Sequence, residues 1–154
     1  MPLKKSVSAT RNPAIVQTPA STGPTRIDSL PADAPRLIVG NLRKYAAPVP
    51  PQYTKIRIDR EDPVLGNPVV LKNKNDELER ISVLEEFNTL LQKDLELNGP
   101  VSQRLDQIAQ RVQQGEPIAL MCWCHPKLCH GHSYVKEIER RLFQWNQSLD
   151  QPAP

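Results

Sequence analysis

The segment from Pro117 to Trp123, with the sequence PIALMCW, constrains the fold more than any other part of the chain. It contains no charged residue, and it is far shorter than the roughly 20 apolar residues that a membrane-spanning helix needs. A strand that is apolar on both faces belongs in the middle of a covered sheet, which is typical of parallel sheets. The segment therefore predicts the central strand of an α/β domain.

Three helical patterns accompany this strand. The first begins at a capping box, Asp76-x-x-Glu79, and breaks at residues 98–100, Asn-Gly-Pro. The second ends at Gly115, because glycine is favoured just after a helix. Charged residues of the first helix are expected on its solvated face. The three apolar stripes are Leu84, Phe87, Leu91 and Leu95; Val101, Leu105, Ile108 and Val112; and Val135, Ile138, Leu142 and Trp145.

Two more strands are predicted ahead of the helices. Residues 37–40, LIVG, are short and rich in β-branched side chains. Residues 53–59 alternate, so that apolar and charged side chains fall on opposite faces. Residues 69–71, VVL, are expected to re-enter the sheet or to form its edge. Together these elements predict a small layered α/β domain with a short, mostly parallel sheet flanked by helices.

The composition divides the chain into three parts. Residues 1–34 are rich in Pro, Ser, Thr and Ala and poor in large apolar side chains. Such a segment cannot offset the roughly 1–2 kcal/mol per residue that backbone ordering costs, so we predict a disordered tail. It is interpreted either as a solvated leader or as an arm that binds a protein partner. Residues 35–149 are predicted to form a single α/β domain, and residues 150–154 a frayed tail.

Composition also argues against a membrane or secreted protein. The 154 residues contain no apolar run of membrane-spanning length, and no secretory signal follows Lys4 and Lys5. We therefore expect a cytoplasmic protein without a membrane partner, in which the cysteines stay reduced. A net charge of +3 permits a nucleotide or nucleic acid partner at a local patch but does not require one.

Every cysteine and histidine of the chain lies between Met121 and His132, in the sequence MCWCHPKLCHGH. This stretch connects the carboxyl end of the predicted central strand to the start of the last helix. Open α/β sheets bind ligands at that edge, and the exposed amides of a helix N-terminus favour an anion. The concentration of these side chains indicates a site.

Two motifs resemble the signature of a known family. One is Gly66-Asn67-Pro68 with the charged residues before it, and the other is C-W-C-x-P-x-x-C-H-G at residues 122–131. Both are similar to an uncharacterised family of small bacterial and phage proteins, domain of unknown function 4326. The resemblance covers about the C-terminal two thirds of the chain and implies no established activity. The acidic residue that often follows Cys-His-Gly in that family is replaced by His132.

The first interpretation of the cluster is a pocket without metal. Cys129, beside His130 at a helix N-terminus, has the surroundings that lower a thiol pKa, and Cys124 is the alternative nucleophile. Such a pocket would bind, and in a stronger form of the hypothesis process, a phosphorylated small molecule, a nucleotide or a nucleic-acid end. Whether the protein is an enzyme stays open. The predicted ligand-binding residues are Arg57, Asp59, Arg60, Gly66, Asn67, Pro68, Gly131 and Ser133.

The second interpretation is a zinc site in an adaptor or nucleic-acid-associated module without catalysis. Its ligands would be Cys122, Cys124, Cys129 and His130, which are zinc-binding residue types. Alternate residues of a straight strand point to opposite faces, so the first two thiols share one ion only if the strand bends. The third interpretation is packing, with Cys122 as a small buried hydrophobe and Trp123 as core or pocket wall. The sequence leaves all three open.

Overall fold

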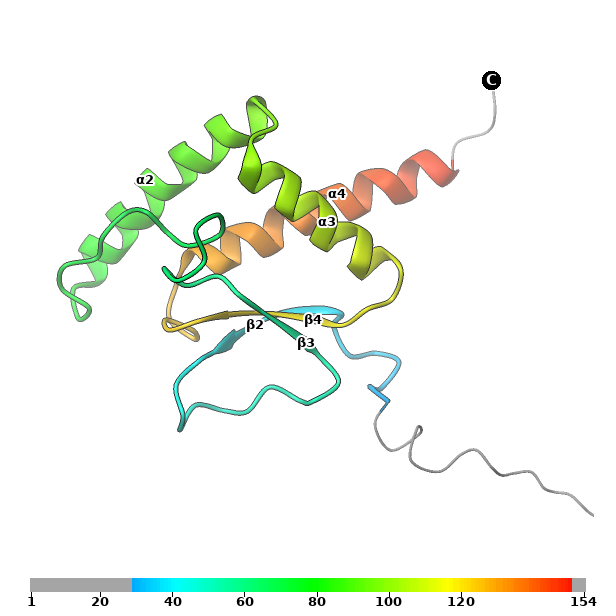
Figure 1. The fold of residues 1–154 in the computed structure, drawn as a ribbon, viewed down its shortest axis with the longest axis horizontal. Coiled ribbons are helices and arrows are strands. Elements are labelled where there is room, and N and C mark those ends of the chain that lie inside the picture. Colours follow the sequence, from blue (N-terminus) through cyan, green and yellow to red (C-terminus); the bar gives the residue numbers. More distant parts are fainter. Residues whose placement is uncertain (1–28, 151–154) are drawn as a thin grey trace, which may run out of the picture. The chain divides into compact units, whose positions relative to one another are not determined.

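The structure is a computed structural model that describes residues 29–150 (Figure 1). Most of the predicted disordered tail, residues 1–28, lies outside this range, and so do residues 151–154 of the predicted frayed end. Residues from Pro35 onward form one compact unit, which is separate from the unit that ends at Ala34. The architecture described below is that of the unit beginning at Pro35.

Within the described residues, three parallel strands form a sheet in the order β2-β4-β3 (Figure 1). The strands are β2 (Leu37–Asn41), β3 (Thr54–Arg57) and β4 (Ile118–Cys122). All five residues of β4 are buried, because both of its edges are hydrogen-bonded and both of its faces are covered. The predicted α/β fold and the central position of the apolar strand are confirmed.

The helices described are α2 (Glu77–Glu96), α3 (Pro100–Gln113) and α4 (His130–Asp150). They lie on one side of the sheet, and the loop between β2 and β3 crosses the other side (Figure 1). The core between helices and sheet holds side chains from all three predicted stripes, including Phe87, Ile108 and Ile138. None of the helices within residues 29–150 is long and apolar enough to span a membrane.

The start of α2 fixes the segment that precedes it. As predicted, the Asp76 side chain caps the helix, accepting hydrogen bonds from the amides of Leu78 and Glu79 at 3.0 and 3.1 Å. The Glu79 carboxylate does not complete the capping box. It accepts hydrogen bonds from the amides of Lys72 and Asn73 instead. The helix therefore holds the loop that leads into it.

The prediction that residues 69–71 form a strand is wrong, because they have no strand conformation. The amide of Val69 donates to Asn67 Oδ1 at 2.8 Å, and its carbonyl accepts from Arg60 Nη2 at 3.0 Å. Pro68 has no amide hydrogen to offer to a neighbouring strand. Side-chain hydrogen bonds thus engage the amide and carbonyl of Val69, which strand pairing would need.

The chain after β3 turns so tightly that Gly66 has no room for a side chain. The Asp62 carboxylate accepts from the amides of Val64 and Leu65 at 2.9 and 2.7 Å, and the Gly66 amide donates to the Asp62 carbonyl at 3.0 Å. A Cβ atom at Gly66 would lie 2.6 Å from the carbonyl oxygens of both Asp59 and Asp62. These are backbone atoms, which cannot rotate away.

We expect Gly66→Ala to lower the free energy of unfolding by about 1–3 kcal/mol, the usual cost of forcing atoms into a filled space. Urea denaturation followed by circular dichroism measures this change. A variant as stable as the wild-type protein would contradict the close packing of this turn.

Candidate functional site

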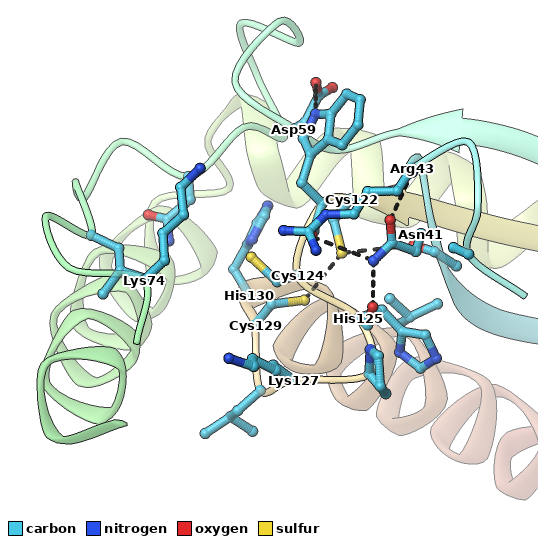
Figure 2. A pocket seen from close by; sticks show the side chains of 18 of the residues that line it. Asn41, Arg43, Asp59, Lys74, Cys122, Cys124, His125, Lys127, Cys129 and His130 are labelled. Atoms are coloured by element: carbon cyan, nitrogen blue, oxygen red, sulfur yellow. Dashed lines mark hydrogen bonds between the residues drawn. The ribbon is translucent and has the colours of Figure 1, made fainter. Parts of the chain in front are cut away.

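A pocket of about 1230 Å³ lies at the carboxyl ends of the strands (Figure 2). Its wall is formed by β2 and the loop after it, the segments after β3 that carry Asp59 and Asn67, the first turns of α2, and the whole turn from Cys122 to His130. This is the edge of a parallel sheet at which α/β domains bind ligands. The Gly-Asn-Pro bend and the Cys/His turn, which are distant in sequence, thus meet in one cavity.

The predicted site residues divide into those on the pocket wall and those behind it. Gly131 packs α4 against the sheet, since a Cβ atom there would lie 2.8 Å from Ile58 Cδ1. Ser133 faces α2, and its hydroxyl donates to Asn88 Oδ1 at 2.7 Å. Residues on the wall are Asp59, Arg60, Asn67, Cys122, Cys124, Cys129 and His130, and those absent from it are Arg57, Gly66, Pro68, Gly131 and Ser133.

The turn between β4 and α4 is held through its backbone carbonyls. The Asn41 side-chain amide donates to the carbonyls of His125 and, at 3.4 Å, Trp123. Arg80 reaches the Leu128 carbonyl from α2, with Nη1 at 3.4 Å from the oxygen. Two other elements of the fold therefore determine where the thiols and imidazoles of the turn lie.

Two of the thiols form a buried pair, with Cys122 Sγ 3.4 Å from Cys129 Sγ. The hydrogen bond from Cys129 lowers the pKa of Cys122 to about 6, helped by the amides of His125 and Cys124 and opposed by burial. The pKa of Cys129 is raised, because its hydrogen bond to Cys122 and its burial both favour the protonated thiol. The sequence pointed to Cys129 as the reactive thiolate, whereas these surroundings favour Cys122.

His130 is buried and joins helix to loop. Its Nε2 lies 2.6 Å from the Ile58 carbonyl oxygen and 3.2 Å from that of Leu65, so this nitrogen carries the hydrogen. Burial lowers the pKa of the imidazole, which favours the neutral form. Phe87 and Tyr134 pack against the ring edge-on, at centroid distances of 5.3 and 5.4 Å. These contacts give His130 a structural role, which is to join α4 to the loop after β3. A catalytic role for His130 stays a prediction.

The four residues of the zinc hypothesis are not arranged as a metal site. Nε2 of His130 is already directed at two carbonyl oxygens. Across the described residues, no three Cys, His, Asp or Glu side chains are grouped so as to hold a metal ion. The residue types suit zinc, but their geometry does not support a tetrahedral set.

Asp59 is an ionised carboxylate whose two oxygens are already engaged. Arg57 donates to it through Nε at 2.9 Å and Nη2 at 2.5 Å, and the Trp123 indole donates to Oδ2 at 2.9 Å. The Arg57 hydrogen bonds hold the pKa of Asp59 below its usual value. Asp59 is therefore better suited to fixing the indole than to accepting a proton from a ligand.

Arg80 is a pocket residue that the sequence analysis missed. It was expected on the solvated face of α2, but it is only 6% exposed and lines the cavity, so that expectation is wrong for this residue. It precedes Leu84 by four residues and Phe87 by seven, which places it on the apolar stripe of the helix. A charged residue in phase with a core stripe was the signal available in the sequence.

The charge of Arg80 has little compensation. Nη2 donates to the Lys74 carbonyl at 2.8 Å, while Nε makes no hydrogen bond within the described part of the chain. The one carboxylate paired with it among residues 29–150 is that of Glu77, 3.9 Å away and 66% exposed. Buried charges are normally paired, so this guanidinium lacks a close anionic partner.

The family model for Domain of unknown function (DUF4326) matches residues 41–140. The chain belongs to this family. No curated protein and no solved structure matches the chain. The pocket falls almost entirely within the family region, since its lining residues lie in the matched range except for Ile38, Val39 and Gly40.

The DUF4326 pocket is positively charged. The basic side chains among its described lining residues are those of Arg43, Arg60, Lys74, Arg80 and Lys127, whereas the acidic ones are Asp59 and Glu61. Asp59 is neutralised by Arg57. Figure 2 shows Arg43 and Lys127 on different sides of the cysteine side chains, with Lys74 across the pocket from them. A cleft lined by one sign of charge concentrates ions of the other.

We expect the native protein to form one thiolate with a midpoint near pH 6, because Cys129 and two backbone amides stabilise the anion of Cys122. Thiolate absorbance at 240 nm, followed from pH 4 to 9 in metal-free buffer, measures this step. Cys122→Ser should abolish it, while Cys124→Ser, the matched control, should retain it. A first thiolate appearing only near pH 8.5, the ordinary value for cysteine, would contradict this assignment.

Proposed function

We propose that this protein binds a phosphorylated ligand in the pocket beside the Cys/His turn. The ligand is a phosphorylated small molecule, a nucleotide or a nucleic-acid end. The observation that carries the proposal is the buried guanidinium of Arg80, which lines the cavity and whose one paired carboxylate among residues 29–150 is that of Glu77, 3.9 Å away.

A phosphate would supply the close anionic partner that Arg80 lacks among residues 29–150. An uncompensated buried ion costs several kcal/mol, and within residues 29–150 this cost is offset by two backbone carbonyls and a distant, exposed Glu77. Guanidinium and phosphate match in charge and geometry, and they form paired charge-assisted hydrogen bonds. Binding a phosphate would therefore remove an electrostatic cost that the fold otherwise bears.

The surroundings of Arg80 support an anion for two more reasons. Lys74 and Lys127 line the same cavity and belong to the segments whose backbone Arg80 contacts. The N-terminus of α4 begins at His130, on the pocket wall, where the helix dipole favours negative charge. These contributions act on the same end of the cavity.

The cysteines on the wall bear on whether the protein also catalyses a reaction on the ligand that it binds. The hydrogen bond from Cys129 lowers the pKa of Cys122 and favours its thiolate, although this thiol is buried. Cys124 is partly exposed on the same wall. A thiolate is the nucleophile that a processing reaction at this site would use. The proposal itself concerns binding.

We expect inorganic pyrophosphate and nucleoside phosphates to raise the melting temperature of the wild-type protein. Arg80→Gln should weaken pyrophosphate binding at least ten-fold in calorimetric titrations, because a buried charge-assisted hydrogen bond is lost. The control is Arg140→Gln, which removes the same charge from a half-exposed position on α4 outside the pocket. Equal affinity in the Arg80 and Arg140 variants, or no phosphate binding by the wild-type protein, would overturn the proposal.

The free protein should respond differently to the same change. Arg80→Gln removes both the cost of the buried charge and the hydrogen bonds to the Lys74 and Leu128 carbonyls. Because these two effects oppose each other, we expect its free energy of unfolding to stay within about 1 kcal/mol of the wild type. Urea denaturation in phosphate-free buffer measures this. A loss of about 3–5 kcal/mol, typical of breaking a buried ion pair, would show that Arg80 is already compensated in the free protein.

A further inference from the structure

We propose that Trp123 is a stacking surface for a nucleobase, and hence that the ligand of this pocket is a nucleotide. The inference rests on the proposed phosphate binding and narrows its ligand class. It depends on three features of Trp123: its exposure, its fixed orientation, and its place in the pocket relative to the basic residues.

The exposure of Trp123 is unusual for its position. It directly follows β4, whose five residues are all buried, yet 47% of Trp123 is exposed. It is one of the residues that line the pocket. Tryptophan is highly buried on average, and exposed apolar surface in a cavity marks a place where a ligand packs.

The orientation of the indole is set before any ligand arrives. Its Nε1 donates to Asp59 Oδ2 at 2.9 Å, and Arg57 holds the other Asp59 oxygen at 2.9 Å. Arg57 is itself paired with Glu61 at 3.3 Å. This chain of charge-assisted bonds fixes the ring from the end of β3. A side chain that is already ordered loses little conformational entropy when it packs against a ligand.

The indole and Arg80 lie at different ends of the pocket. In Figure 2, Asp59, which holds the indole, lies on one side of the cysteine side chains, and Lys127 lies on the opposite side. Arg80 belongs to the Lys127 side, because it contacts the neighbouring Leu128 carbonyl. A ligand with a planar ring at one end and phosphate at the other matches this division. A nucleotide has that form, and its sugar would lie beside the thiols.

The size of the cavity fits such a ligand. Its volume of about 1230 Å³ is above that of common small-molecule pockets, which run from about 300 to 1,000 Å³. Free pyrophosphate would fill only the end that holds Arg80 and Lys127 and leave the indole uncovered. A non-aromatic sugar phosphate would cover the indole without stacking on it. Stacking on tryptophan accepts any base, since every base has a flat π-face.

The test compares the diphosphates of adenosine, guanosine, cytidine and uridine with inorganic pyrophosphate in calorimetric titrations. We expect at least one nucleotide to bind the wild-type protein more tightly than pyrophosphate. Trp123→Leu should raise the Kd of that nucleotide about ten-fold, which is the usual scale of one stacking contact, and leave the Kd of pyrophosphate unchanged. Trp123→Phe, which keeps a ring, should recover most of the affinity.

Fluorescence gives a second measurement that does not depend on the folding of the Trp123 variants. The chain has two tryptophans, Trp123 and Trp145, and Trp145 is on α4, outside the pocket wall. In Trp145→Phe, the nucleotide should quench the remaining emission, whereas pyrophosphate should not.

The outcomes separate this inference from the proposed function. If pyrophosphate binds through Arg80 but no nucleotide binds more tightly or quenches Trp123, base stacking is overturned and phosphate binding stands. If neither pyrophosphate nor any nucleotide binds the wild-type protein, both fail. An equal loss of nucleotide and pyrophosphate affinity in Trp123→Leu also overturns stacking, since it assigns the residue a purely structural role.

Discussion

The pocket depends on the contact between the start of α4 and the carbonyl group of Leu65. Tyr134 Oη donates to that oxygen at 2.9 Å, and His130 Nε2 lies 3.2 Å from it and 2.6 Å from the Ile58 carbonyl. All of these groups are buried, where an unmade hydrogen bond is costly. The contact ties the loop after β3 to the helix after β4. Without it, the Gly-Asn-Pro bend and the Cys/His turn would not enclose one cavity.

The sequence predicted those parts of the fold that are governed by burial. A fully apolar β4 and three amphipathic helices indicate where the core lies, since most buried positions are apolar. The segment at residues 69–71 is equally apolar but is not a strand, because the backbone of Val69 is bonded by Asn67 and Arg60. Apolar composition does not report what the amides and carbonyls of a segment bind, and it did not ensure burial here, since Val70 is 56% exposed.

The candidate site was harder to predict, because its chemistry depends on neighbours far apart in sequence. The Cys/His turn was located from its residue types, but the lowered pKa of Cys122 depends on Cys129 and on the bend of the turn. Arg80 could have been found from its phase with Leu84 and Phe87, whereas its weak pairing could not. The anchoring of Trp123 by Asp59 links residues 64 positions apart and has no local sequence signal.

The way in which the Cys/His turn is held has a consequence for variation among related chains. The side chains of Asn41 and Arg80 donate hydrogen bonds to the backbone carbonyls of His125 and Leu128. Every amino acid has such a carbonyl. The side chains of Lys127 and Leu128 are about half exposed and support no part of the loop's shape by hydrogen bonding within residues 29–150. Substitution at these two positions can therefore change the charge and shape of the pocket wall while the frame persists.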